Sequence, residues 1–432
     1  MKAVISNKIY ISVDDEFKAE LQAKLTYPLI RRGRGGKPVP YKYKDYINVR
    51  KDILAIPVGR TDLIPDGFEI VDKRVAPVAK FPPFGMTLRE DQQEVYDLVE
   101  DSHIINAQPS WGKTFSGIAI ARKLGLKTII VVHTLFLLDQ WVAEIEKTLG
   151  ITPSLITKGK CNIEGPIVVA NVQSLKKFAK EVGKEFGTII LDEGHHTPAS
   201  TFSDILSHFF AKNRICLSAT LKRKDGLEVL LTGLFSHKIV KPKEANNIRP
   251  QILAYGVAVQ LNDDNSIPWA LRIGELYNEP VYQRTVIELA YQFSQVQKLP
   301  TLVVSNRVDF LEFLHEILEE DSVLITGATP NREDLIQLVK DGKKNLIFGT
   351  TAIFAEGLNI PRLACLIPAQ PMKNDPLLEQ LCGRVARLYP GKDKAFVLDL
   401  RLQGKAAGTQ AIDRVKTYAR LGYKVKKLPP LP

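Results

Sequence analysis

The stretch HIINAQPSWGKTFSGIAIARKL, residues 103–124, decides how this chain folds. It opens with a short apolar run at 103–107, which is typical of a buried strand, and it closes with a helix-length run at 115–124. Between the two lies a loop, residues 107–114, that ends in Gly-Lys-Thr. A strand, a short loop and a helix in this order form half of a βαβ unit. The stretch therefore predicts a parallel sheet around this segment.

The loop at residues 107–114 has the composition of a phosphate-binding site. Backbone N–H groups at a helix N-terminus attract anions, Lys113 can reach the β and γ phosphates of a nucleotide, and Thr114 can ligate Mg²⁺. The same loop should be lined by Ser110, Trp111 and Gly112. Ala107 replaces the first glycine of the general pattern, and Ser110 stands where another glycine is common. A chance Gly-Lys-Thr in a turn is therefore the competing interpretation.

Strand-like apolar runs alternate with helix-length amphipathic segments over most of the chain. The first set of strands is expected at residues 103–107, 128–132, 167–170, 188–191 and 214–217. A second set is expected at 301–304, 323–325, 345–348, 364–367 and 395–398. Such alternation is typical of parallel sheets covered on both faces. The sequence predicts an α/β fold with two parallel-sheet lobes, residues 81–240 and 241–432, and a hinge at 241–251, where two prolines and two asparagines fall.

Acidic residues directly follow one of the predicted strands. The run TIIL, residues 188–191, is followed by Asp192, Glu193, Gly194, His195 and His196. The carboxyl ends of parallel strands lie at the edge where the phosphate loop also opens. Asp192 can therefore hold Mg²⁺ through water, and Glu193 can polarise the attacking water. An acidic turn is one alternative. A zinc site is a weaker one, because adjacent histidines point in different directions on most backbones.

The first 80 residues predict a small basic α/β domain. A strand at 9–13 precedes a helix that Asp14 or Asp15 can cap and whose apolar positions are Phe17, Leu21 and Leu25. Prolines at positions 77, 82 and 83 are typical of a linker that ends this domain near residue 80.

Positive charge concentrates in the same domain. The formal net charge of the chain is +11, and residues 1–80 hold sixteen Lys and Arg against ten Asp and Glu. Between residues 31 and 51 cations alternate with aromatics, which predicts a loop that binds nucleic acid. The cations that could follow a phosphate backbone are Arg31, Arg32, Arg34, Lys37, Lys42 and Lys44. The aromatics that could stack or pack beside it are Tyr41, Tyr43 and Tyr46. A solvated basic turn is the alternative.

Taken in order, the motifs resemble those of superfamily 2 helicases. LREDQ at 88–92 looks like the adenine-reading Gln motif, residues 107–114 like motif I, DEGH at 192–195 like motif II and LSAT at 217–220 like motif III. GTT at 349–351 with EGLN at 356–359 looks like motif V, and QLCGRVAR at 380–387 like motif VI. Order and spacing match across residues 84–400. Within the superfamily, DEGHH with SATLKRKDG at 218–226 is similar to the XPB and UvsW branch.

The resemblance implies two RecA-like lobes, ATP and Mg²⁺ as cofactors, and nucleic acid as the partner. It implies that Arg89, Gln92, Gly357 and Gln380 contact the nucleotide. Two motif VI arginines, Arg384 and Arg387, would stabilise the charge that develops on the γ phosphate. A solvated helix face is the alternative for this motif. The nucleic-acid contacts it implies are Thr134, Gln140, Asn171, Gln173, Ser305, Asn306, Arg307, Thr326 and Thr350. Each of these could equally be a helix cap or turn residue.

The expected function is ATP-driven remodelling of duplex and branched DNA in replication, recombination and repair. An RNA helicase is one alternative. A DNA-binding scaffold with residual nucleotide binding is another, although Glu193 and the two motif VI arginines weigh against it. The longest apolar stretch, residues 128–138, is far shorter than the ~20 residues that span a bilayer, so no membrane partner is expected.

The cysteines indicate a reducing compartment. Cys161, Cys216, Cys365 and Cys382 are scattered and lack a CxxC spacing, which is typical of reduced buried thiols. We therefore expect the cytoplasm, that of the host if a phage encodes the protein. A monomer is expected, and an oligomer is the alternative.

Overall fold

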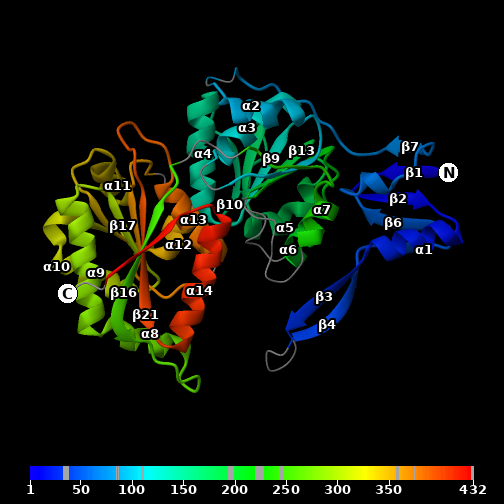
Figure 1. Ribbon diagram of the computed structural model, residues 1–432. Coiled ribbons are helices and arrows are strands. Elements are labelled where there is room, and N and C mark those ends of the chain that lie inside the picture. The colour runs from blue at the N-terminus through cyan, green and yellow to red at the C-terminus, as the bar shows by residue number, and fades with distance from the viewer. Residues whose placement is uncertain are drawn as a thin grey trace. The chain divides into compact units, whose positions relative to one another are not determined.

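A computed structural model describes residues 1–32, 38–83, 85, 87–108, 111–192, 199–218, 228–243, 248–356, 360–373 and 375–429. The chain divides into two compact units, Met1–Ala245 and Asn246–Pro432 (Figure 1). The first unit contains a small N-terminal domain and one large parallel-sheet lobe, and the second unit contains another parallel-sheet lobe. The α/β class with two such lobes is confirmed.

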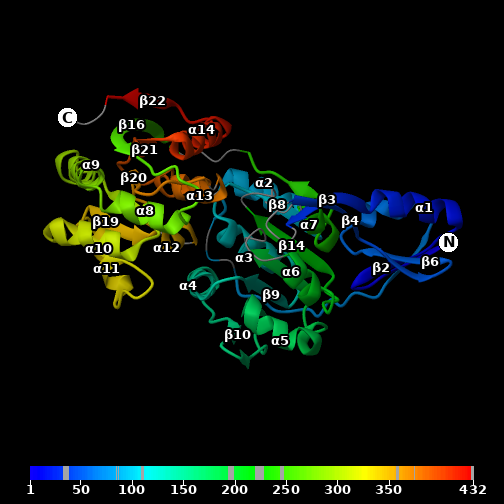
Figure 2. The same cartoon turned by 90° about the horizontal axis from the view of Figure 1, so that it is seen from below.

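The small domain is built on a five-stranded sheet, counted within the described residues. Its strand order is β5 (Ile47–Arg50), β6 (Ile53–Pro57), β2 (Lys8–Ser12), β1 (Lys2–Ile5) and β7 (Glu69–Asp72). Helix α1 (Asp15–Lys24) lies against it (Figure 1 and Figure 2). Asp14 is the N-cap of this helix and accepts a hydrogen bond from the Phe17 N–H at 2.8 Å, as the sequence predicts. Leu21 and Leu25 are buried in the domain core.

The basic segment after α1 is a β-hairpin, so the expectation of a loop there is wrong. Strands β3 (Thr26–Arg32) and β4 (Pro38–Lys44) pair antiparallel and extend from the small domain (Figure 1). Alternation of Lys with Tyr is the two-residue period of a strand, in which neighbouring side chains point to opposite faces. Arg34 and Lys37 lie outside the described residues, as do the side chains of Arg31 and Arg32.

The large lobe of the first unit has an eight-stranded sheet in the part of the chain that is described. Its order is β11 (Lys160–Cys161), β10 (Ser154–Thr157), β12 (Ile167–Asn171), β9 (Thr128–Val132), β13 (Thr188–Asp192), β14 (Asn213–Ser218), β8 (His103–Asn106) and β15 (Ile239–Val240). All the neighbouring strands are parallel except the pair β10 and β11. The five strands predicted for this lobe are confirmed as β8, β9, β12, β13 and β14.

Helices cover both faces of this sheet. They are α2 (Glu90–Leu98), α3 (Lys113–Leu124), α4 (Leu135–Leu149), α5 (Val172–Val182), α6 (Ala199–Leu206) and α7 (Glu228–Leu234). Alternate residues of β9 belong to different cores: Ile130 and Val132 pack with residues of α3 and α4, whereas Ile129 and Val131 pack with residues of α5 and α6. Burial on both faces explains why the strands are continuous apolar runs.

The second unit contains a parallel sheet of seven strands among its described residues. The order is β18 (Ser322–Ile325), β19 (Leu346–Thr350), β17 (Thr301–Ser305), β20 (Cys365–Pro368), β21 (Phe396–Gln403), β16 (Gln251–Gln260) and β22 (Val425–Leu428). The five strands predicted here are confirmed. Strand β16 is not predicted, because it begins where the hinge-like stretch 241–251 ends.

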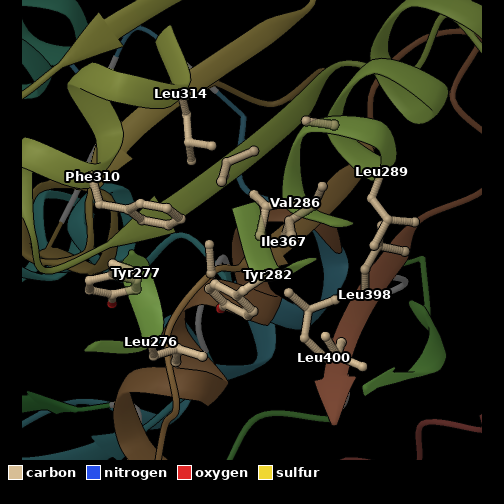
Figure 3. Packing of buried hydrophobic residues seen from close by; sticks show 14 of the residues in the cluster. Leu276, Tyr277, Tyr282, Val286, Leu289, Phe310, Leu314, Ile367, Leu398 and Leu400 are labelled. Carbon is tan, nitrogen blue, oxygen red and sulfur yellow. The ribbon is translucent and has the colours of Figure 1, made fainter. Parts of the chain in front are cut away.

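Helices surround this second sheet as well. They are α8 (Trp269–Tyr277), α9 (Pro280–Tyr291), α10 (Val308–Ile317), α11 (Arg332–Lys340), α12 (Thr351–Glu356), α13 (Asp375–Val385) and α14 (Lys405–Arg420). Figure 3 shows part of the core beneath α8, α9 and α10. There the rings of Tyr277 and Phe310 stack with centroids 4.3 Å apart, while Leu289 and Leu398 fill the adjoining space.

Backbone contacts join the small domain to the large lobe within the first unit. The Gly59 N–H donates to the Gly233 carbonyl at 2.8 Å, and the His237 N–H donates back to the Gly59 carbonyl at 3.0 Å. A Cβ on Gly59 would lie 2.2 Å from the Thr232 carbonyl oxygen, so only glycine fits there. The small domain and the large lobe are therefore joined by backbone hydrogen bonds at a place too tight for a side chain.

The structure also shows how long and apolar its helices are and where its cysteines lie. Among the described residues, no helix has the length and apolar content that a membrane span requires. Cys216, Cys365 and Cys382 are buried free thiols as predicted, but Cys161 is exposed. The prediction was wrong for Cys161 because it lies on the two-residue edge strand β11, which one partner strand alone covers.

The carboxyl group of Asp45 should make the stability of the first unit depend on pH. Asp45 follows β4, and its Oδ2 would lie 2.8 Å from a Cβ on Gly233. Burial raises the pKa of Asp45 from 3.8 to about 6, although Lys8 and Arg60 oppose the shift. Such a group contributes stability that is complete below the unfolded pKa and is lost as pH rises through the folded pKa.

We therefore predict that Asp45→Asn raises the melting temperature at pH 8 by a few degrees, roughly 2–4 °C for each kcal/mol in a domain of this size, and gives a much smaller gain at pH 4. Thermal unfolding followed by circular dichroism at both pH values checks this. Asp52→Asn, on an exposed turn, is the matched control. An equal gain at both pH values would show that ionisation of Asp45 is not the cause.

Candidate nucleotide-binding site

The N-terminus of α3 is open to an anion. Gly112 is the N-cap residue with φ of 93°, and among the described side chains none caps this end of the helix. No acidic residue lies in the first turn, where Lys113 and Thr114 stand. The Lys113 ammonium donates to the Ala107 carbonyl at 3.4 Å, so it bends back over the loop. An uncapped helix N-terminus beside a lysine is the environment that a phosphate group requires.

Two side chains from α2 and its N-cap hold the loop in place. Gln92 is 2% exposed, and its Nε2 donates to the Trp111 carbonyl at 2.9 Å while its Oε1 accepts from the Arg89 N–H at 3.1 Å. The Arg89 guanidinium donates to the same Trp111 carbonyl at 2.7 Å. The structure thus brings Arg89, Gln92, Trp111 and Gly112 together. These bonds anchor the loop, which is a structural role that the sequence did not predict. Ser110 lies outside the described residues.

Asp192 ends β13 and is 4% exposed. Its Oδ2 accepts a hydrogen bond from the indole N–H of Trp141 at 2.8 Å. The ring of Trp141 lies on α3 at Gly117, where an added Cβ would stand 2.9 Å from the ring. Sequence reasoning predicted Asp192 but missed the contacts of Trp141 and Gly117. The signal was an indole N–H on a buried helix face, which needs a polar partner. Glu193, His195 and His196 lie outside the described residues.

The chemistry of these residues fits a nucleoside triphosphate with Mg²⁺. The hydroxyl of Thr114 and the carboxylate of Asp192 are hard oxygen donors, and Mg²⁺ commonly binds to one or two such groups together with phosphate oxygens and water. Within the described ranges, no cluster of three or more His, Cys, Asp or Glu could hold a metal ion by itself. Phosphate oxygens and water would complete the coordination of a magnesium ion held by Thr114 and Asp192.

Two of the four polar residues predicted to contact nucleic acid in the large lobe of the first unit are helix caps. Thr134 caps α4 by accepting from the Leu137 N–H at 3.2 Å. Asn171 caps α5 by accepting from the Gln173 N–H at 3.1 Å, and it is 4% exposed. Gln173 is exposed in the first turn of α5, and Gln140 is half-buried on α4. The cap role that the sequence left open is thus present for Thr134 and Asn171.

The corresponding residues of the second unit differ in exposure. Asn306 is exposed, while Arg307 pairs with Asp309 at 2.6 Å and Thr350 is half-buried at the end of β19. Ser305 is fully buried: its hydroxyl donates to the Tyr277 hydroxyl at 3.0 Å and accepts from the Arg307 N–H at 3.2 Å. Thr326 is 6% exposed and bonds to Thr329. The side chains of Ser305 and Thr326 therefore stabilise turns.

Motif VI occupies α13 and the residues after it. Gln380 is 7% exposed, so the alternative of a wholly solvated helix face is wrong for this residue. Arg384 is half-buried near the helix end. Burial lowers the pKa of Arg387 to about 10, which leaves its guanidinium charged at neutral pH in a partly dehydrated setting. The Lys392 ammonium donates to the Arg387 carbonyl at 2.8 Å. Gly357 lies outside the described residues.

Known proteins share this combination of fold and motifs. Residues 85–223 match the family model "Type III restriction enzyme, res subunit", and residues 283–389 match "Helicase conserved C-terminal domain". A probable helicase of Escherichia phage T5 is 37% identical over 440 residues, which cover 100% of this chain and 97% of that protein.

More distant proteins share the same layout. A DNA 3'-5' translocase of Sulfurisphaera tokodaii, XPB2, is 25% identical over 415 residues, covering 85% of this chain and 90% of that one. The solved structure of S. cerevisiae Dbp5 bound to RNA and ADP BeF3 has a TM-score of 0.58 at 13% identity, over 79% of this chain and 89% of its own.

The two glycines that flank α3 offer a matched test of the loop. Gly112 and Gly125 both have positive φ, at 93° and 65°. A Cβ on Gly112 would lie 2.6 Å from the Gln92 Nε2, whereas a Cβ on Gly125 meets nothing within 4 Å. Substituting alanine at either position costs about 1–2 kcal/mol of stability, because the residue must keep a left-handed backbone conformation. Only Gly112→Ala also displaces Gln92.

We predict that Gly112→Ala weakens binding of a fluorescent ATP analogue, because the new Cβ displaces Gln92 from the loop. The expected loss is about tenfold or more, and a factor of ten corresponds to about 1.4 kcal/mol. Gly125→Ala should lower the melting temperature without changing that affinity. Fluorescence titration and thermal melting of both variants provide the check. Equal affinities of the two variants for the analogue would show that the loop does not contribute to nucleotide binding.

Proposed function

We propose a function from the premise that this chain belongs to the superfamily 2 helicases: it is an ATP-dependent helicase that acts on nucleic acid, and its substrate is branched DNA. Helicase activity and ATP hydrolysis follow from the family. The DNA branch, its remodelling by branch migration or fork reversal, and the residues that perform it are the proposal. An RNA helicase is the second candidate, supported by a relative of Acanthamoeba polyphaga mimivirus that is named a putative ATP-dependent RNA helicase and is 26% identical over 417 residues.

The nucleotide would sit on the N-terminus of α3. Gly112 and the first-turn N–H groups would bind the phosphates, Lys113 would neutralise the β and γ phosphates, and Thr114 with Asp192 would hold Mg²⁺. Bound Mg²⁺ would neutralise charge on the phosphate oxygens. Glu193, next to Asp192, would orient and polarise the attacking water. The open, uncapped end of α3 beside Lys113 is the observation that carries this assignment.

The second unit would supply positive charge to the γ phosphate during hydrolysis. Arg387 is the first choice, with Arg384 beside it. Burial disfavours water around the Arg387 guanidinium, and a poorly hydrated cation stabilises developing negative charge more strongly than a solvated one. Gln380 and Gly357 would contact the nucleotide from the same unit.

We predict that Arg387→Ala leaves the affinity for ATP largely intact and lowers its turnover by roughly 10³-fold, because the arginine acts on charge that forms in the transition state. Steady-state ATPase assays with DNA, together with binding of a non-hydrolysable analogue, separate the two effects. Arg420→Ala, which removes an exposed arginine of α14 that pairs with Glu379 of α13, should leave turnover within a fewfold range. Parental turnover in Arg387→Ala would remove this residue from the mechanism.

The hairpin β3–β4 carries the assignment to duplex and branched DNA. Directly paired residues share a face of the hairpin, so Lys42 opposes Pro28 and Lys44 opposes Thr26 on one side. Both lysines are exposed. Tyr41 and Tyr43 point to the other side, opposite Leu29 and Tyr27, and are half-buried.

The aromatic face of the hairpin is the face that contacts the rest of the small domain. Arg60 donates to the Tyr27 hydroxyl at 3.2 Å, and burial raises the pKa of Tyr43 to about 12. The lysine face therefore stays available to a phosphate backbone, and we propose that Arg31, Arg32, Arg34 and Lys37, which end β3 or lie between β3 and β4 in sequence, contact the same backbone. The relative named a DNA translocase supports DNA over RNA as the polymer.

We predict that the double variant Lys42→Gln, Lys44→Gln binds a four-way junction more weakly and flattens its salt dependence. The slope of log affinity against log salt should fall by about 1.8, since each lost phosphate contact removes about 0.9. The control pair Lys73→Gln, Lys80→Gln removes two exposed lysines from the end of the same domain and the linker.

Fork-reversal and ATPase assays on junction, duplex, single strand and an RNA hairpin complete the experiment. The hairpin variant should lose remodelling more than basal ATPase. A variant with parental slope and remodelling rate, or a parent that RNA stimulates as well as junction DNA does, would contradict the branched-DNA proposal.

A further inference from the structure

Trp141 connects two parts of the candidate nucleotide site. It lies in the middle of α4 and is completely buried. Its indole N–H donates to Oδ2 of Asp192 at 2.8 Å, although 51 residues separate the two in sequence. The same ring lies on α3 at Gly117, three residues after Thr114. One rigid side chain therefore contacts both the helix that carries Lys113 and Thr114 and the carboxylate at the end of β13.

Packing alone does not require this arrangement. A buried Phe or Leu would fill apolar space without a polar partner, whereas a buried indole N–H must find an acceptor. The acceptor it finds is an acidic side chain that is 4% exposed. A hydrogen bond to a carboxylate in a dehydrated site is stronger than one between neutral groups, and it fixes the plane of the carboxylate. The absence of a side chain at Gly117 gives the ring the space to reach it, because a Cβ there would stand 2.9 Å from the ring.

We infer that Trp141 is a positioning residue for magnesium, which acts by holding the Asp192 carboxylate in the orientation that metal binding needs. This inference rests on the proposed function, in which Asp192 serves Mg²⁺. Side chains that orient metal ligands set metal affinity, and their loss typically weakens it by about 10–100-fold. Trp141 itself touches neither nucleotide nor metal in this scheme.

The test measures magnesium dependence of nucleotide binding instead of activity. The full chain is titrated with MgCl₂ in the presence of a fluorescent, non-hydrolysable ATP analogue. Trp141→Phe keeps an aromatic ring and removes the N–H, and the half-saturating Mg²⁺ concentration should rise by about tenfold or more. Because phenylalanine is smaller, a second variant carries a benzothienyl analogue at position 141, in which sulfur replaces the indole N–H at nearly constant volume. It should show the same rise.

Two comparisons separate positioning from general destabilisation. Ile145→Val removes a buried methyl group one turn along α4, costs about 0.5–1.5 kcal/mol, and should leave the magnesium dependence unchanged. In a double-mutant cycle, Trp141→Phe should add nothing to the effect of Asp192→Asn, because Trp141 acts through that carboxylate.

The outcomes are distinct. Parental magnesium dependence in the benzothienyl variant overturns the inference, as does an equal rise in Ile145→Val or an additive double-mutant cycle, while Asp192→Asn still tests the site by itself. If Asp192→Asn binds the analogue with parental magnesium dependence, the magnesium role of Asp192 in the proposed function fails, and the role of Trp141 falls with it.

Discussion

Parallel pairing of three strands brings the chemical groups of the first unit to one edge. Strands β13, β14 and β8 are neighbours, and their registers align Asp192 with Leu217 and Ser218 with Asn106. The three strands therefore end within one residue of each other. The phosphate loop leaves β8, and the Ala107 N–H donates to the Ser218 carbonyl at 3.0 Å, which ties the start of the loop to β14. Everything proposed for ATP depends on this alignment, because a slip in register would separate Asp192 from α3.

Helices next to these loops are held by a buried cation. Arg214 on β14 is 2% exposed, and its guanidinium donates to the carbonyls of Leu206, Phe209 and Leu234 at 3.4, 2.7 and 3.1 Å. These carbonyls lie at or just beyond the C-terminal ends of α6 and α7, where a positive charge is favourable. Burial lowers the pKa of Arg214 to about 9, so the group stays charged at neutral pH. The second unit also buries an arginine, but this one pairs with a carboxylate: Arg414 donates to Asp399 at 2.7 Å.

The small domain is attached in a way that suits a DNA contact. Its connection to the lobe runs through Gly59 and Gly233, whose main chains touch directly, and the next residue, Arg60, holds the aromatic face of the hairpin through Tyr27. The base of the hairpin is thus fixed to the lobe that carries the nucleotide site, while Lys42 and Lys44 face away from the attached side.

Local sequence patterns were enough to predict the strands of both lobes, the cap of α1 and the positions of the helicase motifs. Each of these depends on local periodicity or on fixed spacing along the chain, as in the continuous apolar run at 128–132 that became β9. Its composition also located the basic segment at 31–51, but whether that segment was a loop or a hairpin depended on pairing between β3 and β4.

Contacts between residues distant in sequence could be read from the folded chain alone. The bond of Trp141 to Asp192, the bonds of Arg89 and Gln92 to the Trp111 carbonyl, the burial of Ser305 and the exposure of Cys161 all join or separate segments that the chain brings together only when it folds. Such partners are chosen by the packing of helices on a sheet, which fixes distances that no local pattern encodes.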